Sequence, residues 1–221
     1  RYQEGAVLCN LFLADEINRA GSRTQAALLE AMEEGAVTVD GVTRPIPQPF
    51  AVIATQNPTG AAGTQLLPDS QLDRFMLRFS LGYPSHDAEV ELLRRKNEGN
   101  RQRAQQVMDA AALQQAQKQV RQVFISPEVY DYIVRLVGAT RTYPGVRQGA
   151  SPRASIALTC LAQAAAFLQG RDYVVPQDAA LLFQEAVAHR LLLTPAGEAR
   201  GLNAPGVLED ILRKTPRPRL R

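Results

Sequence analysis

Hydrophobic and polar positions divide the chain into an α/β portion followed by an all-α portion. Residues 6–14 and 50–55 are almost continuously apolar, which is typical of strands covered on both faces in a parallel sheet. Residues 75–81 place apolar side chains at alternate positions, which predicts a third strand. The first portion of the chain is therefore expected to contain a small parallel sheet.

A helix and a hairpin are predicted between the first two strands. The pattern S-x-x-Q at residues 22–25 matches a capping box, and apolar residues then recur at helical spacing, so a helix is predicted over residues 23–34. Valines alternate with polar residues on both sides of Asp40-Gly41, which is a type I′ turn signal. Residues 37–46 are therefore predicted to form a small hairpin.

From Pro84 onward the pattern is helical, with no strand signal of any strength. The polar stretch 98–106 is interpreted as a linker. The chain is thus divided into an α/β core (1–100), a helical domain (107–195), and a C-terminal helix with a basic tail (196–221). The predicted helices are residues 85–97, 109–122, 127–141, 152–168 and 176–193.

Charge and cysteine content exclude several classes of protein. The net charge is +3, but residues 213–221 carry five bases and no acid, so the basicity belongs mainly to the tail and nucleic-acid binding is not favoured. Cys9 and Cys160 lie far apart, which suggests neither a disulfide framework nor a metal site. No apolar run approaches the roughly 18 residues of a membrane span. A cytoplasmic protein without a membrane span is expected.

Polar side chains stand where the predicted strands begin or end. Asp15 and Glu16 follow the first strand, Asn57 follows the second, and Arg74 precedes the third. Because ligands of parallel sheets collect at the strand ends, these groups are expected to meet at one edge. Oxygen ligands suit Mg²⁺, and an acid can activate a water molecule. The pattern therefore suggests a site for a magnesium-bound triphosphate, although each residue alone is more often a cap, a turn or a surface charge.

Arg153 also has a local argument. Ser151 and Pro152 are helix N-cap and N1 signals, which place Arg153 in the first helical turn. A cation there opposes the helix dipole, at a cost of about 0.3–1 kcal/mol, unless an anion such as phosphate lies nearby. Arg153 is therefore a candidate phosphate contact, and an outward-pointing arginine is the alternative.

Six motifs together resemble the MoxR family of AAA+ ATPases. They occur in the family's order and extend over nearly the whole chain apart from the basic tail. The motifs are LFLADEINRA, GAVTVDGVTRPIPQPFAVIATQNP, QLDRF, GASPRA, GRDYVVPQDA and HRL.

The resemblance implies a role for each candidate residue. Asp15 corresponds to the magnesium-side acid of the Walker B strand, and Glu16 to the catalytic base. Asn57 corresponds to sensor 1, and Arg74 to the arginine finger offered to a neighbouring subunit. Arg153 corresponds to sensor 2, the arginine of the helical lid that reaches the nucleotide. The hairpin at Asp40-Gly41 resembles the pre-sensor 1 hairpin.

The fold that the resemblance implies is a partial AAA+ P-loop NTPase core with a helical lid. The sequence contains no G-x-x-x-x-G-K-[ST] loop, which this chemistry requires, and none of its three lysines follows a glycine. We therefore expect the chain to be a fragment whose phosphate-binding loop lies upstream, so that the central strand of the sheet is missing. Such a chain should bind Mg²⁺ and ATP weakly or not at all, which calorimetry can measure.

For the intact protein, the resemblance implies ATP hydrolysis in a homo-oligomeric ring, expected to be hexameric. It also implies chaperone-like remodelling of protein clients and a von Willebrand A-type partner. Two alternatives stay open: a DNA-acting AAA+ motor, and a non-catalytic scaffold derived from an ATPase. The hairpin argues against DNA, because it offers one base, Arg44, and no aromatic side chain for stacking.

Overall fold

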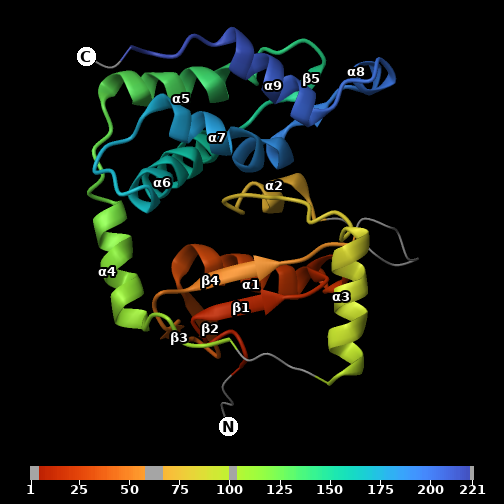
Figure 1. Ribbon diagram of the computed structural model, residues 1–221, viewed down its shortest axis with the longest axis vertical. Helices are drawn as coiled ribbons and strands as arrows, with labels where there is room; N and C mark the ends of the chain where they lie inside the picture. The colour runs from red at the N-terminus through yellow and green to blue at the C-terminus, as the bar shows by residue number, and fades with distance from the viewer. Residues whose placement is uncertain (1–4, 58–66, 100–103, 220–221) are drawn as a thin grey trace.

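The computed structural model describes residues 5–57, 67–99 and 104–219. It shows an α/β portion and a helical portion that lie one above the other, with the short helix α2 (Asp69–Leu72) between them (Figure 1). Helices α3 (His86–Asn97) and α4 (Ala110–Val120) flank this stack on opposite sides. The predicted linker lies partly outside the described residues.

The α/β portion is built on two parallel strands, β1 (Leu11–Ala14) and β4 (Ala51–Ala54). Their register pairs Leu11 with Ala51 and Ala14 with Ala54, so the residues that follow the two strands lie side by side. Both strands are shorter than predicted. One face of the pair packs against Ile17 and Leu28, and α1 (Ser22–Glu34) thereby joins the sheet in a small core.

The opposite face of these strands is exposed, so the prediction of strands covered on both faces was wrong. Leu11 and Leu13 are each 62% exposed, and Ile53 is 53% exposed. Among the described residues, the buried apolar cluster that packs against these strands consists of Ile17, Leu28 and Leu67. Both faces of these two strands carry apolar side chains, which explains the continuous apolar runs in the sequence. In the described chain only the face toward α1 is buried.

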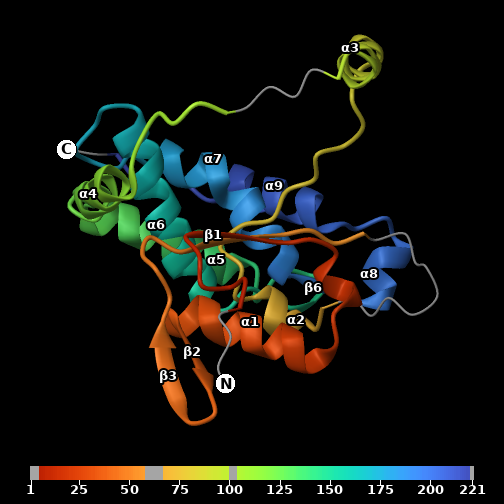
Figure 2. The same cartoon turned by 90° about the horizontal axis from the view of Figure 1, so that it is seen from below.

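The hairpin is confirmed. Strands β2 (Ala36–Val39) and β3 (Val42–Pro45) are antiparallel, and Asp40 and Gly41 both have positive φ, at 53° and 75°, as a type I′ turn requires. Strand β2 begins directly after α1, and the hairpin projects away from the rest of the molecule (Figure 2).

The first turn of α1 differs from the predicted capping box. Gly21 is the N-cap and Ser22 is already helical, so the serine hydroxyl does not cap the helix. The side chain of Gln25 instead donates to the backbone oxygen of Ile17, at 3.1 Å. Buried Gln25 therefore ties the helix to the turn that follows β1.

The predicted third strand, residues 75–81, is not formed. A strand needs a neighbouring strand for its backbone groups. In this segment the N–H of Arg78 instead bonds the backbone oxygen of Glu185, and the backbone oxygen of Phe75 accepts from the side chains of His189 and Arg190. Phe79 is 66% exposed and Leu81 is 90% exposed. The alternating pattern is present, but the described residues provide no strand to pair with it.

The helical portion has a core of its own, formed where helices α5, α6, α7 and α9 pack together. Tyr132, Leu136 and Phe183 are completely buried in it. Within the described residues, no helix combines the length and the apolar content needed to cross a membrane. The helices after α4 are α5 (Pro127–Ala139), α6 (Pro152–Leu168), α7 (Pro176–Val187), the 3₁₀ helix η2 (Ala188–Arg190), α8 (Pro195–Ala199) and α9 (Ala204–Lys214).

The prediction that this portion is entirely helical was wrong. The helix expected over residues 176–193 ends at Val187, and β6 (Leu192–Leu193) pairs with β5 (Val146–Gln148) in an antiparallel ladder. Pro195 disfavours helical backbone at the preceding residue, Thr194, whose N–H bonds the backbone oxygen of Gly145. Pro195 therefore disfavours a helix through Thr194, although α7 itself ends earlier, at Val187.

Candidate functional site

The ends of β1 and β4 bring three of the predicted residues together. Asp15 and Glu16 follow β1 directly, and Asn57 lies three residues beyond β4. The side-chain amide of Asn18 donates to the backbone oxygen of Asn57, at 3.3 Å. Asn18 is buried, so the segment after β4 is fixed against the turn after β1. The sequence prediction that these residues share one edge agrees with this arrangement.

Thr55 fixes the acidic pair at this edge, and the sequence analysis gave it no role. Its hydroxyl donates to Asp15 Oδ1 at 2.5 Å and accepts from the backbone N–H of Glu16 at 2.8 Å. The backbone oxygen of Thr55 also accepts from the N–H of Ile17, at 3.0 Å. The residue directly after β4 therefore orients the carboxylate of Asp15 and the backbone of Glu16. The only sequence signal was its position at a strand end.

Glu16 has left-handed backbone, with φ 49° and ψ 48°. This conformation is uncommon for a residue with a side chain and indicates a turn held by its surroundings, here by Thr55 and Ile17. The Glu16 carboxylate forms an ion pair with Arg19, with 2.9 Å between Oε2 and Nη1. Glu16 is therefore half-buried at the edge, with a cation as its immediate neighbour.

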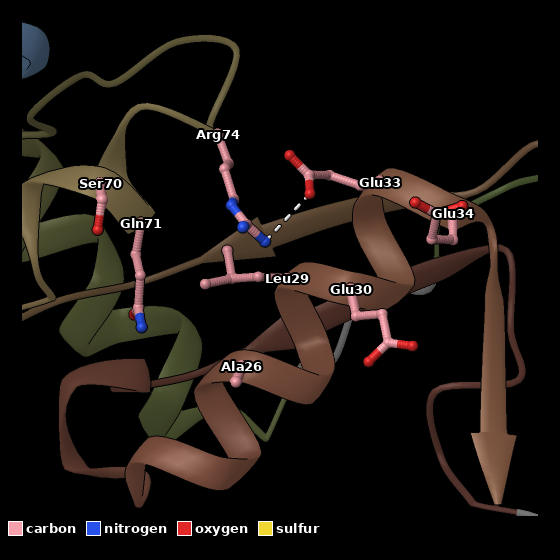
Figure 3. Close-up of a pocket in the computed structure, with 8 residues that line it drawn as sticks. All are labelled: Ala26, Leu29, Glu30, Glu33, Glu34, Ser70, Gln71 and Arg74. Atoms are coloured by element: carbon pink, nitrogen blue, oxygen red, sulfur yellow. Dashed lines mark ion pairs between the residues drawn. The ribbon is translucent and has the colours of Figure 1, made fainter.

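The two predicted arginines lie together, but not with the acidic pair. Arg74 follows α2 and Arg153 begins α6, and both contact Glu33 in the last turn of α1. Figure 3 shows Arg74 and Glu33 beside an open cavity of about 420 Å³ between α1 and α2. The expectation that Arg74 meets the acids at one edge of the sheet is therefore not met within one molecule.

The length of α1 separates the two groups. Gln25, near the start of this helix, is bonded to the turn that carries the acids, whereas Glu33 is eight residues further along. At 1.5 Å per residue this interval corresponds to about 12 Å along the helix axis. The acids lie near one end of α1 and the arginines at the other.

A further arginine, Arg190, links the two portions. Its Nε donates to Asp73 Oδ1 at 3.0 Å, and its Nη2 donates to the backbone oxygens of Asp73 and Phe75 at 3.0 and 2.7 Å. The hydroxyl of Ser151 donates to the same Asp73 carboxylate. The side chain of Arg190 is 2% exposed, and its burial lowers its pKa. The residue before the candidate finger is thus held by the helical portion.

His189 belongs to the same junction. Its Nε2 lies 3.1 Å from the backbone oxygen of Phe75, so the neutral ring donates its proton there. Burial, with a further effect of the Arg190 charge, lowers the pKa of His189 to about 4. The imidazole is therefore neutral near pH 7 and acts as a structural contact.

The acidic edge suits a magnesium ion that is shared with a nucleotide. Within the described ranges there is no group of three or more His, Cys, Asp or Glu placed to hold a metal. Mg²⁺ usually takes one or two carboxylates and completes its shell with phosphate oxygens and water. Thr55 occupies one oxygen of Asp15, which leaves the other oxygen for such an ion.

Two protein families match the chain. Residues 1–77 match the ATPase family associated with various cellular activities (AAA), and residues 138–211 match the AAA lid domain. These two segments include the acidic edge, Arg74 and Arg153.

Individual proteins give the same result. The chain is 42% identical to an uncharacterised protein, YeaC, of Bacillus subtilis over 96% of its length, and 38% identical to Chaperone MoxR1 of Mycobacterium tuberculosis over 98%. It spans 66% and 59% of the lengths of these relatives. A crystal structure of a putative ATPase from Cytophaga hutchinsonii superposes with a TM-score of 0.92 at 37% identity, over 98% of this chain and 69% of that one. A crystal structure of an MCM homologue from Methanopyrus kandleri shares the fold, with a TM-score of 0.54 at 24% identity, over 82% of this chain and 38% of that one.

Proposed function

Because the chain belongs to the MoxR family of AAA+ ATPases, we propose that its acidic edge serves the hydrolysis of ATP. The observation that carries the proposal is the joint positioning of Asp15 and Glu16 by Thr55 at the end of a parallel strand pair. Strand ends of parallel sheets are where α/β proteins bind nucleotides.

In this proposal Asp15 holds Mg²⁺ through the oxygen that Thr55 leaves available. The ion supplies positive charge at the phosphate oxygens. Glu16 accepts a proton from the attacking water, and the side chain of Asn57 orients that water. Arg19 contacts Oε2 of Glu16, which leaves Oε1 of the same carboxylate to accept the proton.

Arg74 and Arg153 stabilise negative charge on the phosphates in this scheme. Since they lie at the far end of α1 from the acids, the proposal places Arg74 at the nucleotide of a neighbouring subunit. A homo-oligomeric ring, hexameric in this family, brings such surfaces together. The phosphate-binding loop is absent from the 221 residues, and we propose that sequence outside them supplies it.

The biological role proposed is remodelling of protein clients in the cytoplasm. It is supported by the family and by the name of the Mycobacterium tuberculosis relative, a chaperone. A von Willebrand A-type protein is the partner that we propose on the same basis. The exposed hairpin β2–β3 is a suitable element for contact with a client (Figure 2).

The test is Glu16→Gln in the full-length protein. The amide cannot accept the proton from water but keeps the side chain's shape, so ATP turnover should fall at least about 100-fold. Nucleotide affinity, measured by calorimetry, should stay within about twofold, because a general base contributes to the transition state and not to ground-state binding.

Glu30→Gln is the matched control, since Glu30 is an exposed acid on α1 away from the edge, and its turnover should equal that of the wild type. Unchanged turnover in Glu16→Gln would remove Glu16 from the mechanism. A wild-type protein without ATP turnover would favour the non-catalytic scaffold.

A further inference from the structure

Glu33 is shared by the two arginines to which phosphate-directed roles were assigned. Its Oε2 lies 3.1 Å from Arg74 Nη1, and its Oε1 lies 2.8 Å from Arg153 Nη2. Each carboxylate oxygen therefore receives one guanidinium group. Figure 3 shows the Arg74 side chain directed at Glu33 from across the cavity.

The two arginines come from different portions of the molecule. Arg74 belongs to the segment after α2, which the helical portion holds through Asp73, and Arg153 lies in the first turn of α6. Two guanidinium groups at one place repel each other unless an anion lies between them. Glu33 provides that anion from a third element, α1, and so keeps both arginines at one location.

Glu33 neutralises the two arginines only in part, and another anion can readily replace it. One carboxylate carries a single negative charge against two positive ones. The side chains of Arg74, Glu33 and Arg153 are 31%, 35% and 50% exposed, so water screens both pairs and each is weak. A phosphate group carries more charge and three acceptor oxygens, and it binds arginine in a two-pronged geometry. Phosphate is therefore the stronger partner for both side chains.

Glu33 and Arg74 lie at a cavity that is open to solvent. The Arg74–Glu33 pair borders an open cavity, so an anion carried by another chain can approach it. Glu30, Glu33 and Glu34 line this cavity with a single cation, Arg74. Of these three acids, Glu33 is the one that the described structure pairs with both arginines, so they must turn away from Glu33 to meet a phosphate.

We propose that Glu33 is a positioning residue that holds Arg74 and Arg153 together until a nucleotide phosphate replaces it. This inference rests on the proposed function, which assigns both arginines to the nucleotide. Glu33 acts as a competitor for the arginines: it keeps them paired and close together in the absence of nucleotide, and part of the ATP binding energy is used to release them.

The experiment is Glu33→Gln in the full-length protein. Glutamine keeps the length of the side chain and an acceptor oxygen but removes the charge that competes with phosphate. The KM for ATP should fall about fivefold, the factor expected from losing two exposed ion pairs, while kcat changes less than about twofold. Glu33→Asp, which keeps the charge, should show a smaller fall in KM.

Two controls separate this role from a structural one. Glu34→Gln makes the same charge change at the next position on the cavity wall and should leave KM at the wild-type value, because the arginines pair with Glu33. In an Arg74→Ala, Arg153→Ala background, Glu33→Gln should no longer change KM, since the groups it restrains are gone.

A KM in Glu33→Gln equal to or above that of the wild type would overturn the proposal, as would an equal fall in Glu34→Gln. If the wild type turns over ATP and Glu16→Gln does not, such a result refutes Glu33 alone. If the wild type shows no turnover, the proposed function and this inference fall together.

Discussion

The helical and α/β portions use similar apolar elements but bury them to very different extents. In the helical portion Tyr132, Leu136 and Phe183 are fully enclosed by packed helices. In the α/β portion the strands bury one face against α1, and Leu13 on the other face is 62% exposed. The difference indicates that most of the stability of this chain resides in the helical portion. The α/β portion keeps its site geometry through local polar contacts such as those of Thr55.

The largest effect is expected from the helical core. Phe183→Ala leaves a cavity among packed side chains, so the free energy of unfolding should fall by about 3–5 kcal/mol. Leu181→Ala, on the same helix but 58% exposed, should cost less than about 1 kcal/mol. Urea unfolding followed by circular dichroism measures both variants. Equal losses would show that the helical portion is not packed as described.

An intermediate effect is expected at the junction between the portions. The folded state holds His189 neutral, with its pKa lowered to about 4, whereas the unfolded chain binds a proton near the ordinary value of 6.5. Between these values the unfolded state carries more protons, so stability is fully present above pH 6.5 and is lost as the pH falls towards 4. The loss from this residue is at most about 3 kcal/mol.

His189→Gln should remove most of this slope between pH 6.5 and 4, because glutamine does not titrate. His86→Gln is the control, since His86 is exposed. This substitution should leave the pH dependence of stability unchanged. Urea unfolding at several pH values measures both. The same slope in His189→Gln and the wild type would show that His189 is not the group responsible.

The smallest effect is expected on the open face of the sheet. Leu13→Ala removes a side chain that is largely in water, so the free energy of unfolding of this chain should change by less than about 0.5 kcal/mol. In a longer protein that includes the proposed upstream sequence, the same substitution should cost about 2–4 kcal/mol if that sequence covers this face. If Leu13→Ala lowers the free energy of unfolding by the same small amount in both proteins, this face of the sheet is exposed in both. The helical portion would then remain the better buried of the two.

Local signals predicted the helical portion well. Ser151 caps α6 with its side chain, as the sequence predicted, because capping depends on residues three positions apart or fewer. Asp109 and Ser126 cap α4 and α5 in the same way. The hairpin was predicted for the same reason, from the turn at Asp40-Gly41. The prediction of a third strand was wrong, because a strand needs a partner strand, and the pattern of the segment itself does not show whether one is present.

The site was predicted in part. The order of the motifs was enough to place Asp15, Glu16 and Asn57 at one edge, since paired parallel strands end together. Glu33 and Arg190 were not predicted, because their partners lie far away in sequence: Arg153 is 120 positions beyond Glu33, and Asp73 is 117 positions before Arg190. No rule of residue spacing predicts either pair, because the two partners become neighbours only in the folded chain.

Helix α1 has a mechanical consequence. It is a single uninterrupted helix of 13 residues, anchored at its start to the turn carrying the acids and at its end to the two arginines. Such a rod is stiff along its axis, so a displacement at one end is transmitted to the other with little loss. A displacement of the turn that carries Asp15 and Glu16 therefore also shifts Glu33, with which both arginines are paired.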